Sequence, residues 1–206
     1  SSIGLLAIIK RHEQKSFFGL KNYIGNQNTA YFNGIFQSII RTTNHGYKTG
    51  VSFLADDYQE SFNDSAFTRT EIVPGGFFEY TYNREQLISL VLGVRGDYHN
   101  LYGFKFTPRA HFKWNFSERS AFRLTAGSGF RTPNVIVENS SVFASSRKLI
   151  VEEQLLPEEA INAGASLVHK FELIGMESSI SLDYYYTFFT NQAVVDLDKN
   201  VHEIHI

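Results

Sequence analysis

Apolar and polar side chains alternate with a period of two along several segments of this chain, and this alternation predicts β-strands. In the clearest segment, residues 109–116, the side chains on one face are all apolar: Ala110, Phe112, Trp114 and Phe116. The same alternation recurs in three further segments: 88–98, 122–127 and 181–188. A helix would scatter these side chains around its circumference, so the chain is expected to be all-β.

Composition supports strands and excludes several functions. The 206 residues include 19 Phe and 11 Tyr but only 4 Pro, and aromatic side chains pack well on a pleated surface. The net charge of −2 gives no electrostatic argument for binding nucleic acid. Without Cys, the chain has no thiolate metal site, disulfide or Cys nucleophile. No segment approaches the roughly 18 apolar residues of a transmembrane helix, whereas a spanning strand needs only about 9–11 residues.

Short and long connections alternate between the predicted strands. The short connections are rich in turn-forming or polar residues: 42–46, 83–86, 115–119 and 172–175. The long connections are expected at 12–28, 57–66 and 131–158, with a shorter one at 100–104. Outer-membrane barrels have tight periplasmic turns at one end and larger external loops at the other. We therefore expect an antiparallel up-and-down transmembrane β-barrel, with about ten strands of a larger barrel in this chain.

The alternation alone does not distinguish a membrane barrel from a soluble β-sandwich. In a sandwich the apolar faces form a dry core, whereas in a membrane barrel they contact lipid and the polar faces line the lumen. Two features favour the barrel. Aromatic residues gather near strand ends, where they suit lipid headgroups: Tyr80, Tyr82, Tyr98 and Tyr102. The strands are also longer than typical sandwich strands of about 5–6 residues, and most are joined as consecutive hairpins.

Several short motifs follow one another in a fixed order between Ile72 and Asp198. They include Gly93-Val94-Arg95-Gly96-Asp97, Pro108-Arg109, Gly127-Ser128-Gly129-Phe130-Arg131-Thr132-Pro133 and Leu156-Pro157-Glu158. Each motif is weak alone, but their order and spacing together are more specific. In this arrangement the chain resembles the C-terminal half of the barrel of TonB-dependent receptors, of the kind abundant in Bacteroidetes-like bacteria. The residues before Ile72 fit as preceding strands, so the resemblance covers most of the chain.

The resemblance implies an active importer in the bacterial outer membrane. Such receptors close a barrel of about 22 strands around a plug domain, bind a scarce nutrient and use energy delivered through TonB. The nutrient is often a metal chelate, cobalamin or a glycan. The implied partners are outer-membrane lipid, the plug domain, TonB and a small-molecule or glycan ligand. No enzyme activity, cofactor or nucleic-acid partner is expected. The chain has no plug and no TonB box, so residues 1–206 are expected to be one partial barrel domain.

Charged residues on the predicted inner face are candidates for contact with a ligand or with the plug. For Arg95, Asp97, Arg109 and Arg123, pairing with neighbouring strands of the wall is the favoured interpretation. Arg131 lies at a strand end before the longest connection, and the two interpretations are equally supported there.

The long connection from Thr132 to Pro157 is a second candidate region. Its polar and charged residues include Glu138, Asn139 and Arg147. External loops on a rigid scaffold often carry ligand contacts, and a solvated loop without such contacts is an equally good interpretation.

Catalytic and metal-binding patterns are not convincing. Asp196-x-Asp198-x-Asn200 begins like a calcium loop, but Val201 stands where the turn requires Gly. His202 and His205 are three residues apart, which does not match a helical zinc pair. We therefore expect no metal site and no catalytic site.

Two other functions remain open at this point. One is a small autonomous outer-membrane barrel acting as a pore, adhesin or enzyme. The other is a soluble β-sandwich that binds a ligand.

Overall fold

The computed structural model describes residues 1–63, 65–139, 145, 147–150, 156–196, 198–200 and 203–205. Its main feature is one antiparallel sheet of nine strands. The strands are β1 (Ser2–Phe18), β2 (Lys21–Ile40), β3 (Thr42–Phe62), β4 (Ser65–Arg84), β5 (Ile88–His99), β6 (Gly103–Ser117), β7 (Ser120–Arg131), β9 (Glu158–Leu173) and β10 (Met176–Asn191). The all-β prediction is confirmed, with nine long strands in the sheet in place of about ten.

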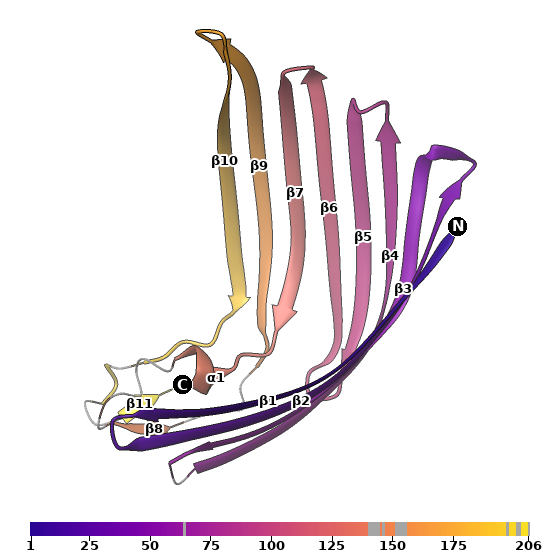
Figure 1. Ribbon diagram of the computed structural model, residues 1–206. Coiled ribbons are helices and arrows are strands. Elements are labelled where there is room, and N and C mark those ends of the chain that lie inside the picture. Colours follow the sequence, from indigo (N-terminus) through magenta and orange to yellow (C-terminus); the bar gives the residue numbers. More distant parts are fainter. Residues whose placement is uncertain are drawn as a thin grey trace.

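The strands follow an up-and-down order, because each strand pairs with the next long strand along the chain. The sheet is strongly curved, and β1 and β10 are its two edges (Figure 1). Within the described residues these edges do not pair with each other, so the chain forms part of a barrel wall. Three short elements lie at one end of the sheet: α1 (Val135–Glu138), β8 (Lys148–Ile150) and β11 (Glu203–His205). β8 and β11 pair in parallel.

The described residues contain no helical segment that could span a bilayer, since α1 is only four residues long.

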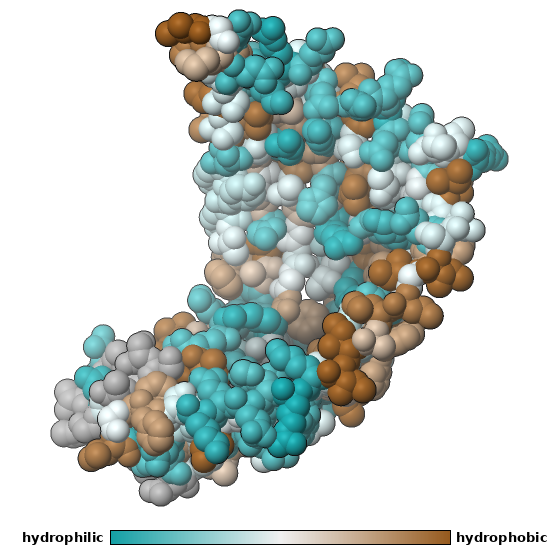
Figure 2. Space-filling view, in the orientation of Figure 1, coloured by the Kyte–Doolittle hydropathy of each residue, from teal (hydrophilic) through white to brown (hydrophobic). Residues whose placement is uncertain are grey.

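The two faces of the sheet have an inverted distribution of polarity. One face carries buried charged or ionisable side chains, among them Asp97 and His99, which are only 3% and 1% exposed. On the other face the apolar side chains are exposed, with Phe104 at 67% and Leu182 at 72%. Much of the face turned to the viewer in Figure 2 carries hydrophilic or neutral residues. No second sheet covers the apolar face in the described residues, so the β-sandwich alternative is not supported.

The polar face is the inside of the curve. The same face of β2 and β3 packs against α1 and β11, which lie within the bend of the long strands (Figure 1). The contact is a small apolar cluster of Tyr23, Phe62, Ile136 and Ile204, with Phe18, Phe67 and Val195 at its border. We call the two sides of the sheet the concave face and the convex face.

The predicted long connections 12–28 and 57–66 are wrong, because both segments are strand hairpins. β1 and β2 continue to a tight turn at Gly19 and Leu20, and Phe62 pairs with Ser65 across the β3–β4 turn. Polar residues occupy both faces of these strands, so the alternation of hydrophobicity disappears there although the strands continue. The predicted turn at 42–46 is also wrong, since Thr42 already belongs to β3 and the turn lies at Arg41, whose φ is 60°.

The remaining connections agree with the sequence prediction more closely. Tight turns join β4 to β5, β6 to β7 and β9 to β10, all at one end of the wall, which we call the short-turn end (Figure 1). The connection after β7 is long and contains α1 and β8. It lies at the opposite end, which we call the loop end.

Candidate functional site on the concave face

The strand register arranges the polar side chains of the concave face in rows that run across the wall. Residues that are direct partners in a sheet point to the same face. One row crosses the middle of the wall from β2 to β10: Gln37, Lys48, Glu79, Gly93, Arg109, Gly127, Asn162 and Thr187. The concave face is therefore a continuous polar surface at this level.

Arg109 is paired with a carboxylate two strands away. Its Nη2 donates to Glu79 Oε2 at 2.6 Å, and Lys48 Nζ lies 3.3 Å from the other oxygen of Glu79. Gly93 stands between Glu79 and Arg109 in the row. A Cβ at Gly93 would lie 2.8 Å from Arg109 Nε, so the missing side chain leaves the path of the arginine open.

Arg95 and Asp97 form a two-pronged ion pair on β5. Arg95 Nε and Nη2 donate to the two oxygens of Asp97 at 2.7 and 2.6 Å, and Nη2 also donates to Ser52 Oγ at 2.6 Å. Such bidentate pairs are strong and geometrically specific. The absence of a side chain at Gly75 leaves space for the Asp97 carboxylate, because a Cβ at Gly75 would lie 1.9 Å from Asp97 Oδ1.

A buried cluster around Glu71 was not anticipated from the sequence. Glu71 lies 2.7 Å from Arg69 Nε and 3.4 Å from His99 Nε2, and it accepts a hydrogen bond from Thr132 Oγ1 at 3.3 Å. His99 Nδ1 accepts from the backbone N–H of Leu101 at 3.2 Å. The available signal was the period-two spacing of Arg69, Glu71 and Val73, which places all three on one face.

Arg69 connects this cluster to the loop end. Its two Nη atoms donate to Pro133 O at 3.3 Å and to Asn134 Oδ1 at 2.9 Å, and its guanidinium lies 4.6 Å from the ring centre of Tyr58. The start of the long connection is thereby fixed against β3 and β4.

Asp56 organises a neighbouring polar group on the same hairpin. It is 7% exposed and accepts hydrogen bonds from Thr29 Oγ1, from Gln27 Nε2 at 3.2 Å and from Tyr58 OH at 3.4 Å. Burial, followed by the charges of Asp56 and Glu71, raises the pKa of Tyr58 to about 12. The hydroxyl of Tyr58 therefore keeps its proton near neutral pH and remains a donor.

Arg131 joins the two sides of the long connection. Its Nη1 and Nη2 donate to Glu138 of α1 at 3.2 and 3.0 Å, and its Nε donates to Glu158 at the start of β9. Glu158 also accepts from the backbone N–H of Ala193 at 3.1 Å. The structure thus brings together two of the predicted residues, Arg131 and Glu138, and adds Glu158.

The other two predicted loop residues contact the backbone. Asn139 Nδ2 donates to Val135 O at 2.9 Å at the end of α1. The carbonyl of Arg147 accepts from Lys21 Nζ at the start of β2. Ser146, a further polar residue of this connection, lies outside the described residues.

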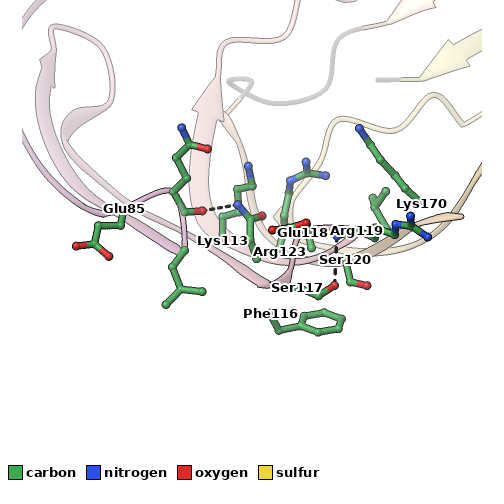
Figure 3. A pocket seen from close by; sticks show the side chains of 14 residues that line it. Glu85, Lys113, Phe116, Ser117, Glu118, Arg119, Ser120, Arg123 and Lys170 are labelled. Carbon is green, nitrogen blue, oxygen red and sulfur yellow. Dashed lines mark hydrogen bonds between the residues drawn. The ribbon is translucent and has the colours of Figure 1, made fainter. Parts of the chain in front are cut away.

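Several cavities open on the concave face, and two of them exceed about 500 Å³. One, of about 510 Å³, lies between Arg109 and Arg131 and also has His111, Asn162 and Phe189 in its lining. The other, of about 580 Å³, lies at the short-turn end and includes Lys113 and Arg123 (Figure 3). In the part of the chain that the structure describes, no group of three or more His, Asp or Glu residues is placed to hold a metal ion.

The family comparison matches almost the entire chain. The model of the family described as "TonB dependent receptor-like, beta-barrel" matches residues 8–203. The chain belongs to this family. No curated protein matches it.

Several solved structures share the fold at low sequence identity. The siderophore receptor PirA from Pseudomonas aeruginosa is 13% identical with a TM-score of 0.63, covering 98% of this chain and 43% of that one. A mutant of the ferric enterobactin receptor PfeA from the same species is 12% identical, with a TM-score of 0.64 and coverage of 83% and 28%. FpvAI in complex with pyocin S2 is 12% identical, with a TM-score of 0.63 and coverage of 98% and 32%. The chain spans less than half the length of each.

The rows of this TonB-dependent receptor barrel show how the predicted inner residues are partnered. Arg109 pairs with Glu79 on another strand of the wall, which agrees with the favoured interpretation, whereas Arg95 and Asp97 pair with each other on β5. Arg123 differs, because it has no salt bridge within the described residues. Whether any of them contacts a ligand or a plug stays a prediction.

Proposed function

We propose that this chain forms part of the wall of an outer-membrane importer that takes up a scarce nutrient. The observation that carries the proposal is the inverted polarity of the two faces, with buried charges on the concave face and exposed apolar side chains on the convex face. Membership of the receptor family supports it. On this proposal, the concave face lines an aqueous lumen and the convex face contacts outer-membrane lipid.

The convex face has the rows that lipid contact requires. One row near the short-turn end consists of apolar side chains from five neighbouring strands: Ile88, Trp114, Phe122, Leu167 and Leu182. Aromatic and aliphatic side chains at one depth suit a membrane interface. The short-turn end is then periplasmic, and the loop end is external.

Among the nutrients considered, we favour a metal chelate over cobalamin and a glycan. Two proteins of similar fold are named a siderophore receptor and a ferric enterobactin receptor, which motivates the choice. Both arginines of the cavity between Arg109 and Arg131 are paired with carboxylates, yet they keep 55% and 60% of their side chains exposed and, with His111, can contact an anionic chelate. We assign ligand contact first to these two arginines.

The other predicted residues receive different proposed roles. Glu138, Asn139 and Arg147 lie on the long connection and shape the external entrance. Arg95 and Asp97 stabilise the wall by pairing. Arg123 faces the plug domain, and TonB acts on that domain from the periplasmic side. The Bacteroidetes-like source remains a prediction.

Uptake by the full-length receptor tests the proposal. A strain lacking the gene should lose import of a radiolabelled ferric chelate under iron limitation, and the intact gene should restore it. Arg109→Gln should reduce import more than Arg11→Gln, because Arg11 is an exposed residue on the edge strand. If the strain lacking the gene still imported the chelate but lost uptake of cobalamin or of a glycan, the choice of nutrient would be contradicted. If that strain took up the chelate, cobalamin and the glycan normally, an import function would be contradicted.

A further inference from the structure

The ladder between β6 and β7 ends before the two strands do. Its last pair toward the loop end is Arg109 with Gly127, although residues 103–108 of β6 and 128–131 of β7 still belong to strands. Both segments remain paired on their other sides, with β5 and with β9. The first residue of β6 beyond the last pair is Pro108, which has no N–H to donate to a ladder. We call the gap between these two segments the window.

The space around the last pair shows that the strands separate there. A Cβ at Gly127 would lie 3.3 Å from Pro108 O, whereas a Cβ at Gly129 would have open space within 4 Å. Nearer the loop end, Lys105 of β6 reaches Glu159 of β9, with Nζ and Oε1 2.5 Å apart. The window is therefore bounded by backbone pairing at one end and by an ion pair at the other.

Cavities from both faces of the wall meet at the window. The cavity of about 510 Å³ on the concave face contains Arg109 and Arg131. A second cavity, of about 290 Å³, is lined by Phe104, Phe106 and Ile161, which are exposed on the convex face. Four residues line both cavities: Ser128, Gly129, Phe130 and Ala160. The window thus connects the arginine cavity with the apolar side of the wall.

An empty window would be unfavourable in a membrane. It lies level with exposed apolar residues, because Phe106 pairs with Gly96 and this row continues through Gly76 to Val51. Open backbone N–H and C=O groups at this level need hydrogen-bond partners, which lipid tails do not supply. An occupant must therefore offer polar groups to the open strand edges and apolar groups to the convex side. An acyl chain joined through an amide or ester to a polar head offers both.

We propose that the window admits the acyl tail of the ligand, so that the nutrient is an amphiphilic metal chelate. Its anionic head contacts Arg109 and Arg131, and the amide or ester link lies against the open strand edges. The tail passes between β6 and β7 and packs on Phe104, Phe106 and Ile161. The inference rests on the proposed function, because it adds a tail to the chelate proposed there. A membrane lipid fits less well, since its head stays at the bilayer surface and does not reach the arginine cavity.

Binding of two matched chelates to the full-length receptor in lipid nanodiscs tests the window. The probes are an anionic ferric tris-catecholate that carries either an acetyl amide or an octanoyl amide. Each methylene buried from water should tighten binding about fourfold. With part of the chain buried in the window, the octanoyl form should bind at least about tenfold more tightly than the acetyl form.

Two phenylalanine variants separate the window from general partitioning of the tail into lipid. Phe106→Ala should weaken binding of the octanoyl form by about tenfold, because Phe106 lines the convex cavity and not the arginine cavity. Phe116→Ala is the matched control, since Phe116 lies on the same strand and the same face but at the short-turn end. Neither variant should change binding of the acetyl form.

A photoreactive tail locates the bound chain directly. A diazirine at the end of the octanoyl chain loses N₂ on illumination, and the resulting carbene inserts into a neighbouring bond. Mass spectrometry should find the label on residues 103–108 or on Ile161. A phospholipid that carries the same diazirine shows where membrane lipid alone reaches.

Equal affinities of the receptor for the two chelates would overturn the inference, as would equal effects of the two phenylalanine variants. Labelling of the window by the phospholipid alone would assign it to membrane lipid instead. Uptake of the acetyl chelate is measured separately. Normal uptake without any effect of the tail would refute the window and leave the proposed function standing. Labelling of the window by the octanoyl chelate, in a receptor that imports neither form, would support the window and contradict the import function.

Discussion

At the scale of single residues, glycines decide where charges on the concave face meet. Gly93 lies between Glu79 and Arg109, and Gly75 lies beside Asp97. In both places a side chain would occupy the space that a charged neighbour uses. The conformational freedom of glycine is not needed at these positions, and the absence of Cβ is what matters.

The substitution Gly75→Ala tests this role of glycine. The new Cβ would lie 1.9 Å from Asp97 Oδ1, so Asp97 and Arg95 must move apart. Overpacking of this kind costs about 1–3 kcal/mol of the free energy of unfolding, measured by urea titration of the full-length receptor in vesicles. Gly76→Ala is the matched control, because its Cβ would face the other side and lie 3.7 Å from the nearest atom, Gly50 O. Equal losses for the two variants would contradict the explanation.

Exposure separates the strong ion pairs of the wall from the weak ones. Asp97 keeps 4% of its side chain exposed, whereas Arg131 and Glu138 keep 60% and 35%. Solvent screens exposed pairs, so a double-mutant cycle with Arg131→Gln and Glu138→Gln should give a coupling of about 0.2–1 kcal/mol. Arg95→Gln and Asp97→Asn should show a larger coupling in the same unfolding measurement. A larger coupling for the Arg131 pair would show that solvent screening does not rank these pairs.

At the scale of elements, the sequence predicted the strands in which one face is apolar. β5, β6 and β7 alternate clearly, and their register keeps the predicted polar face together. The far parts of β1, β2 and β3 were assigned to loops because residues such as His12, Glu13 and Asn26 place polar groups on both faces. Alternation reports contact with an apolar medium, so it cannot mark a strand that has polar surroundings on both sides.

The candidate site was predictable to the same extent. Arg95, Asp97, Arg109 and Arg131 were found because they alternate with apolar residues. The partners of these residues could not be predicted in the same way. Arg109 reaches Glu79 across an intervening strand, and the Glu71 cluster joins β4 to residues after β7. Those contacts depend on the register between strands, which no local pattern contains.

The apolar cluster at the loop end should couple the long hairpins to α1 and β11. Ile204 is completely buried against Tyr23, Phe62 and Ile136. Ile204→Ala should cost about 2–5 kcal/mol locally and raise hydrogen exchange at the tips of β2 and β3, with β5 and β6 unchanged. Val194→Ala is the control, because Val194 is 68% exposed. Exchange that rises equally in β5 and β6 would indicate that the cluster supports the whole wall.

At the scale of the whole molecule, the same alternation supplies both surfaces of a barrel wall. Side chains pair and neutralise one another on the concave face, where the wall meets its own partners. On the convex face Arg11 and Glu13 form an exposed salt bridge, but large apolar residues remain exposed there until another medium covers them. If lipid is that medium, the two faces must respond oppositely to an added charge.

Neighbouring residues on β5 provide that comparison. Leu92 lies on the convex face and is 45% exposed, whereas Val91 faces the lumen, since adjacent residues of a strand point to opposite faces. An arginine facing lipid near the bilayer midplane costs about 2–4 kcal/mol, so Leu92→Arg should reduce folding of the full-length receptor into vesicles, read from heat-modifiable gel migration. Val91→Arg places the same charge in an aqueous lumen and should fold nearly normally. If Val91→Arg proved the more damaging variant, the apolar residues of the convex face would belong to a protein interior. The convex face would then not be the side of the wall that contacts lipid.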